Sequence, residues 1–224
     1  MFLTSKIKFF KMSLALLLGI LLVLPPPVNS SGPIKENMLI GVILGDSLSA
    51  GYGVKLDESW PSILEKNLNN EGIHIKIVNA GISGDTTSGG LFRLPKLLEE
   101  HQPNLVILEL GGNDGLRGMS IEKVIKINLD TMIKMSKDAG AEVVLVGVEL
   151  PPNYGNKYTS QFKNMYVELA NKHHLNLIEG SIKEMVASNL MQADGIHPNI
   201  NGHLMVEQEV RKKILPLLEK QFID

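Results

Sequence analysis

Two short segments at opposite ends of the chain carry side chains that can act together on an acyl group. Residues 45–49 (GDSLS) place a serine directly after an aliphatic run, and residues 194–199 (DGIHPN) place a histidine three residues after an aspartate. A serine hydroxyl is a weak nucleophile until a histidine removes its proton, and the histidine needs a carboxylate to fix its tautomer. Ser47, His197 and Asp194 are therefore candidates for a nucleophile, its base and an orienting acid.

Two glycine-containing segments offer donors for the negative charge that develops on a carbonyl oxygen during acyl transfer. Residues 81–85 (GISGD) and 111–114 (GGND) each follow an aliphatic run. A glycine lets the backbone approach closely, and an asparagine amide donates N–H. Simpler interpretations exist, because Asn113 and Asp114 favour turns and a serine such as Ser47 often caps a helix.

The elements that must position these segments are predicted by alternating patterns along the chain. Aliphatic runs at residues 38–44, 73–78, 105–110, 143–148 and 175–178 suit strands buried on both faces. Helical patterns lie between them, at residues 60–71, 91–100, 120–139, 159–173, 181–187 and 201–215. Such alternation predicts a parallel sheet with helices on both faces and a site at the carboxyl ends of the strands.

The four segments, in this order, resemble the four sequence blocks of the SGNH (GDSL) hydrolases. The matching residues are Gly45-Asp46-Ser47-Leu48, Gly84, Gly111-x-Asn113-Asp114 and Asp194-x-x-His197. Longer matches at residues 45–52, 110–118 and 194–199 make the chain similar to the bacterial periplasmic subgroup of acyl-CoA thioesterases, lysophospholipases and arylesterases. The chain has no G-x-S-x-G sequence, which argues against the common α/β-hydrolases.

The resemblance implies a flavodoxin-like three-layer α/β/α sandwich with a five-stranded parallel sheet over residues 38–224. It also implies that carboxylic esters and thioesters are hydrolysed through an acyl-serine, with no metal or other cofactor. Ser47 would be the nucleophile, His197 the base and Asp194 its orienting acid. The Ser47 N–H, the Gly84 N–H and the Asn113 side chain would hold the oxyanion.

The expected substrates are lysophospholipids, acyl thioesters or aryl esters. Leu150, Pro151 and Tyr154 follow the fourth predicted strand at the same sheet edge, where a lipid or aryl group needs an apolar groove. Ordinary loop packing explains these residues equally well. An exported carbohydrate acetylesterase of the same family and a non-catalytic exported binding module are the alternatives.

Three further polar residues lie close to the candidate site in sequence. Asp46 and Asp114 are candidate substrate contacts, but we expect Asp46 to be structural, since adjacent residues on an extended segment point in opposite directions. Asp114 is expected to brace its loop by hydrogen bonds. His203 follows His197 closely, but no further ligand accompanies the pair at a metal-site spacing, so a structural role is expected and no metal site is predicted.

The first thirty residues have the pattern of a signal peptide. Lys6, Lys8 and Lys11 precede 13 uncharged residues at 12–24, and PPPVNS follows at residues 25–30. As a helix, such a run rises only about 20 Å, which is short of the roughly 30 Å hydrocarbon core of a membrane. We expect cleavage near Ser30, export to the periplasm or the medium, and a flexible leader at residues 31–37. Retention as an uncleaved anchor is the alternative.

The composition excludes several classes of protein. The 224 residues are 44% apolar and contain no cysteine, which argues against a disordered chain, a disulfide scaffold or a cysteine-ligated metal site. The net charge of -2 provides no basic surface for nucleic acid. Cleavage at Ser30 would remove three lysines and no acid, leaving 19 basic and 24 acidic side chains. A monomer that acts on a small molecule is expected.

Overall fold

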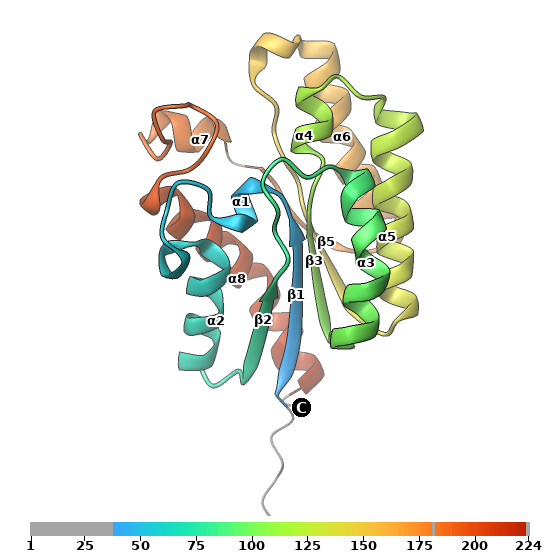
Figure 1. Ribbon diagram of the computed structural model, residues 1–224, viewed down its shortest axis with the longest axis vertical. Coiled ribbons are helices and arrows are strands. Elements are labelled where there is room, and N and C mark those ends of the chain that lie inside the picture. The colour runs from blue at the N-terminus through green and yellow to red at the C-terminus, as the bar shows by residue number, and fades with distance from the viewer. Residues whose placement is uncertain (1–37, 181, 223–224) are drawn as a thin grey trace, which may run out of the picture. The chain divides into compact units, whose positions relative to one another are not determined.

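The computed structural model describes residues 38–180 and 182–222, so the predicted signal peptide and leader lie outside it. One sheet of five parallel strands runs through this part of the chain (Figure 1). Its order is β2-β1-β3-β4-β5, which is the flavodoxin-like order of doubly wound sheets. The strands are β1 (Leu39–Gly45), β2 (Ile75–Asn79), β3 (Leu105–Glu109), β4 (Glu142–Val146) and β5 (Asn176–Ile178). The predicted fold class is confirmed.

Helices cover both faces of this sheet. In Figure 1, α3, α5 and α6 lie on one side of the strands, and α2 and α8 lie on the other. Short helical turns η1 (Leu56–Glu58) and η3 (Pro152–Tyr154) lie within loops, and η2 (Ile121–Ile125) runs directly into α5. The α-helices are α1 (Ser47–Ala50), α2 (Trp60–Asn70), α3 (Thr87–His101), α4 (Gly112–Leu116), α5 (Lys126–Asp138), α6 (Asn156–His173), α7 (Ile182–Ala187) and α8 (Ile200–Phe222).

The central strands are buried on both faces, as their uninterrupted aliphatic runs predict. On β1, Val42 and Leu44 belong to the core under α3, α5 and α6, whereas Ile43 belongs to the core under α2 and α8. All three side chains are fully buried. Each aliphatic side chain removed from water in this way contributes about 1.5–3 kcal/mol. The two cores therefore hold the sheet edge, and the residues that follow each strand, in fixed positions.

Several helices begin or end away from their predicted bounds. Helix α3 starts at Thr87 rather than near residue 91, because the Thr86 hydroxyl accepts the Gly89 N–H and caps the helix. Gly90 lies inside the helix because it packs closely against Leu110, and a Cβ at this position would overlap the Leu110 side chain. Residues 112–116 form α4, where the sequence favours a turn. Helix α8 continues to residue 222, past the predicted end at 215.

From the carboxyl ends of the parallel neighbours β1 and β3, the chain runs from β1 to β2 on one side and from β3 to β4 on the other, which creates a crevice between them. Gly45 of β1 lies beside Glu109 of β3, so α1 and α4 leave the sheet as neighbours. Within residues 38–180 and 182–222, no helix is long and apolar enough to cross a membrane. Over the same residues, no group of three or more His, Cys, Asp or Glu could hold a metal ion.

Candidate active site

Ser47 is the first residue of α1, directly beyond the carboxyl end of β1. Asp46 caps this short helix, and its carboxylate accepts the Leu48 N–H at 3.1 Å. The first N–H groups of a helix have no partner inside the helix, so the Ser47 N–H is available to a ligand. The cap thus fixes both the Ser47 hydroxyl and its backbone donor at the edge of the sheet.

Ser47, His197 and Asp194 form a continuous chain of hydrogen bonds. The Ser47 hydroxyl lies 2.9 Å from His197 Nε2, and His197 Nδ1 lies 2.7 Å from Asp194 Oδ2. A carboxylate can only accept, so Nδ1 carries the ring proton and the Nε2 lone pair faces the serine. The sequence predicted these three residues as a group, and the fold brings them together across 150 positions of the chain.

Asp194 is held in its ionised form by the turn that carries it. Its Oδ1 accepts the N–H groups of Ile196 at 2.9 Å and His197 at 3.0 Å. Partial desolvation acts in the opposite direction, but these hydrogen bonds and the His197 ring lower the pKa of Asp194 to about 2. An ionised Asp194 can fix the histidine tautomer and stabilise a protonated ring.

Two residues that the sequence did not single out hold the histidine turn. The ring of Tyr52 lies 4.4 Å from the ring of His197, centroid to centroid. The Gln192 side chain donates to the carbonyls of Tyr52 at 2.7 Å and Pro198 at 2.8 Å, and the Gln192 N–H donates to the His197 carbonyl. Gln192 therefore links the segment after α1 to the turn that carries His197.

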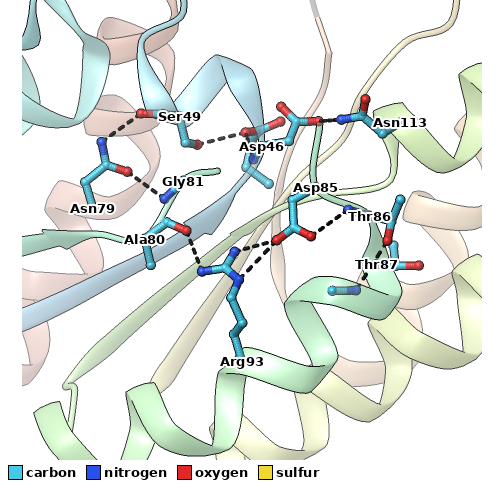
Figure 2. A network of polar contacts seen from close by, with 12 residues as sticks. Asp46, Ser49, Asn79, Ala80, Gly81, Asp85, Thr86, Thr87, Arg93 and Asn113 are labelled. Carbon is cyan, nitrogen blue, oxygen red and sulfur yellow. Dashed lines mark hydrogen bonds and ion pairs between the residues drawn. The ribbon is translucent and has the colours of Figure 1, made fainter. Parts of the chain in front are cut away.

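The candidate oxyanion donors lie on two further elements. Asn113 is on α4, and its amide donates to Asp46 Oδ2 at 3.1 Å, which leaves a second N–H on the same nitrogen (Figure 2). Gly84 lies between β2 and α3 with φ of 81°, a conformation that favours glycine. The Arg117 guanidinium donates to the Gly84 carbonyl at 3.1 Å, which connects this loop to the end of α4.

Asp114 joins α4 to α3. Its two oxygens accept the Thr87 hydroxyl at 2.6 Å and the Thr87 N–H at 2.9 Å, and its side chain is fully buried. These contacts match the bracing role expected from the sequence, and Asp114 does not line the cavity described below.

A buried acidic pair lies beneath the serine. Glu109, at the end of β3, accepts the Ser49 hydroxyl at 2.8 Å and the Asp46 N–H at 3.3 Å, and it is 1% exposed. Burial, followed by the nearby Asp46 charge, raises the pKa of Glu109 well above its usual range. Burial likewise raises the pKa of Asp46 to about 6, against the hydrogen bond from Leu48. Glu109 holds the segment on both sides of Ser47, and its one sequence signal was a charge inside an aliphatic run.

A cavity of about 380 Å³ opens beside Ser47, Asn113 and His197. Leu150 and Pro151, two of the predicted substrate contacts, line it, as does Asp46. Tyr154 does not line it, because its hydroxyl donates to the Leu116 carbonyl instead. The apolar residues of the wall also include Leu48, Leu116, Val146, Val148, Pro152, Ile178, Met185, Val186, Met191, Ile196, Pro198 and Val206. The cavity can therefore hold an apolar group within reach of the serine.

Comparisons with known proteins agree with this arrangement. Residues 43–205 match the model of the GDSL-like lipase/acylhydrolase family. An arylesterase of Vibrio mimicus is 42% identical over 84% of this chain and 92% of its own. A protein of Escherichia coli K12 named thioesterase 1/protease 1/lysophospholipase L1 is 40% identical over 79% of this chain and 84% of its own. The crystal structure of the psychrotrophic esterase EstA from Pseudoalteromonas superposes with a TM-score of 0.75 at 36% identity, covering 80% of this chain and 98% of that one.

Proposed function

Because this chain belongs to the GDSL-like lipase/acylhydrolase family and is an ester-cleaving serine hydrolase, we propose that Ser47 is its nucleophile, His197 its general base and Asp194 the orienting carboxylate. The observation that carries this assignment is the unbroken contact from the Ser47 hydroxyl through the His197 ring to Asp194, with distances of 2.9 and 2.7 Å. This is the arrangement in which a histidine can take the serine proton while a carboxylate supports the charged ring.

The reaction proceeds through an acyl-serine. Ser47 Oγ attacks the acyl carbonyl as His197 Nε2 takes the hydroxyl proton, and the carbonyl oxygen becomes an oxyanion. When the tetrahedral intermediate collapses, the protonated His197 gives this proton to the departing alcohol or thiol. A water molecule then enters, loses a proton to His197 and attacks the acyl-serine. Release of the carboxylic acid returns the proton to Ser47 Oγ.

The oxyanion is stabilised by the Ser47 N–H, the Gly84 N–H and the free N–H of Asn113. Asp46 supports this role for Asn113, since it accepts the other amide hydrogen and so restricts the rotation of the side chain. Donors that are already oriented before the reaction need no reorganisation when charge develops on the oxygen. Asp46 and Asp114 thus support the site rather than contact the substrate.

The substrate class is an ester or thioester with an apolar acyl or aryl group. The lining of the 380 Å³ cavity supports this class, because its wall beside Ser47 is formed mainly by aliphatic side chains and prolines. A sugar ester would need several polar partners for its hydroxyls, and besides the residues around Ser47 the polar lining consists of Glu109, Glu149, Glu179 and Glu209. Lysophospholipids, acyl thioesters and aryl esters satisfy the requirement, in keeping with the names of the relatives.

The assignment is tested by Ser47→Ala, with Ser160→Ala on the exposed surface of α6 as the matched control. Ser47→Ala should abolish turnover of p-nitrophenyl butyrate and covalent labelling by a fluorophosphonate, and it should leave the thermal unfolding midpoint nearly unchanged. Ser160→Ala should behave as the parent chain in all three assays. Retained turnover in Ser47→Ala would refute the nucleophile. A parent chain that binds p-nitrophenyl esters without turnover or labelling would be a binding module.

Export is a second part of the proposal, and it rests on the sequence of residues 1–30 alone. The basic cluster, the short apolar run and the small residues before Ser31 support removal of this segment during export. Expression of the full chain with a tag after Asp224 in a Gram-negative host should yield a periplasmic or secreted protein whose first residue is Ser31. Recovery of a membrane-bound protein that still begins at residue 1 would instead indicate an uncleaved anchor.

A further inference from the structure

The loop that carries Gly84 is tied at both ends by one side chain from α3. Arg93 donates through Nε and Nη2 to Asp85 Oδ2, at 3.1 and 2.6 Å, and through Nη1 to the Ala80 carbonyl at 2.9 Å (Figure 2). Ala80 directly follows the residue at the end of β2, and Asp85 follows Gly84. A single planar guanidinium therefore spans the loop from its first residue to the residue beyond Gly84.

Few backbone hydrogen bonds hold this loop by themselves. The Ala80 and Ile82 N–H groups donate to the Ile43 and Gly45 carbonyls at 2.8 and 3.1 Å, and the Asp85 N–H donates to the Ile82 carbonyl at 3.0 Å. The Gly84 conformation, with φ of 81°, is one of several that a glycine adopts at similar cost. The direction of the Gly84 N–H consequently depends on side-chain contacts, namely those of Arg93 at the two ends of the loop and the hydrogen bond from Arg117 to the Gly84 carbonyl.

The ion pair between Arg93 and Asp85 restrains the position of the Asp85 carboxylate. The two side chains are only 22% and 12% exposed, so solvent and salt screen the pair less than a surface pair. Asp85 Oδ1 also accepts the Thr86 N–H at 2.9 Å, and a Cβ at Gly89 would overlap the Asp85 carboxylate. Asp85 is thus fixed by its contacts with Arg93, Thr86 and Gly89, and Arg93 joins it to the Ala80 carbonyl.

The other ion pair on α3 offers a contrast. Lys96 contacts Glu100 one helical turn away at 3.4 Å, and both side chains are largely exposed. Such a pair supports the helix alone and contacts no loop. In contrast, Arg93 makes a third hydrogen bond, to the neutral Ala80 carbonyl. This bond adds no ion pair, but it fixes the distance between α3 and the start of the loop.

We propose that Arg93 is a positioning residue for ester hydrolysis, which holds the loop 80–86 so that the Gly84 N–H faces the oxyanion. The inference rests on the proposed role of Gly84 as an oxyanion donor. Because the oxyanion exists only along the reaction path, a loosened donor weakens binding of the transition state and leaves binding of the substrate almost unchanged. Loss of Arg93 should therefore lower kcat and spare KM.

The test compares Arg93→Ala, Arg93→Lys and the control Lys96→Ala with the parent chain, using p-nitrophenyl butyrate. Removal of a whole oxyanion donor costs about 10²–10³ in kcat, so a donor that is only loosened should cost roughly 10- to 100-fold. Arg93→Ala should show this loss with KM changed by less than about threefold. Arg93→Lys, which keeps the charge but not the planar fork, should fall between Arg93→Ala and the parent, and Lys96→Ala should match the parent.

Added guanidinium distinguishes positioning from general destabilisation. At about 50 mM, far below denaturing concentrations, guanidinium should restore part of kcat in Arg93→Ala and none in Ser47→Ala. Parent-like kcat in Arg93→Ala, or a loss that guanidinium does not restore and that follows a lowered unfolding midpoint, would overturn the inference. In either case an inactive Ser47→Ala would leave the proposed nucleophile intact. An active Ser47→Ala would overturn both proposals.

Discussion

The stability of the fold should depend on pH through one buried histidine. His203 lies on α8, is fully buried, and accepts the Trp60 N–H on Nδ1 at 3.3 Å. Its Nε2 has no hydrogen-bond partner within the part of the chain that the structure describes. Burial, and to a smaller extent the charge of His197, lower the pKa of His203 from 6.5 to about 4. A second ring proton would also remove the acceptor of the Trp60 N–H.

The sign and size of the effect follow from these two pKa values. Between about pH 4 and 6.5, the unfolded chain binds a proton at this residue and the folded chain does not, so the free energy of unfolding rises with pH. The difference between the two values corresponds to about 3 kcal/mol in total. About 2 kcal/mol of this should be lost on going from pH 8 to pH 5. Asp46, whose pKa is raised to about 6, acts in the opposite direction in that range.

The measurement is urea unfolding of the parent chain and of His203→Asn at pH 8 and pH 5, followed by far-ultraviolet circular dichroism. The asparagine carbonyl can still accept the Trp60 N–H but does not titrate. Because Asp46 is present in both proteins, its contribution cancels in the comparison. The variant should be less stable than the parent at pH 8, owing to its smaller side chain. It should lose about 2 kcal/mol less than the parent between the two pH values. An equal loss in both proteins would refute the reasoning.

Two further predictions concern the site. Asn113→Ala should lower kcat for p-nitrophenyl butyrate by about 10²–10³ with KM nearly unchanged, because one oxyanion donor is removed; a loss below about threefold in steady-state assays would exclude that role. Leu150→Ala should deepen the cavity, so kcat/KM across a series of p-nitrophenyl esters should move toward longer acyl chains, by about fourfold for each additional buried methylene. A chain-length profile identical to that of the parent would show that Leu150 does not contact the acyl group.

Local patterns in the sequence predict much of the fold and the residues proposed for catalysis. The five aliphatic runs predicted the five strands, because strands buried on both faces must be apolar throughout. The D-x-x-H spacing predicted that Asp194 and His197 act as a pair, since both lie on one turn. The start of α3 was predicted too late, because Gly89 and Gly90 are weak helix formers and only packing shows why they are tolerated.

The residues that support the site were harder to predict, because their partners are distant in sequence. Glu109 contacts Ser49 across 60 positions, and Gln192 contacts Tyr52 across 140. Arg93 has its partner only eight positions away, but a basic residue on an amphipathic helix normally belongs to a solvated face. Residue type and spacing indicate which side chains can react. The contacts that orient those side chains depend on which loops the fold brings together.

The histidine turn differs from the rest of the site in how it is attached to the protein. Asp194 and His197 are three residues apart on an exposed turn, anchored by Gln192, by hydrogen bonds from Asn199 and by a bridge between Met191 and Pro198. Ser47, in contrast, follows a strand in which every residue except Ile40 is buried. Local opening of that turn would move the proposed base and its orienting acid away from Ser47 together while the sheet stays folded. Reversible heat inactivation is therefore expected to begin below the temperature at which the protein melts.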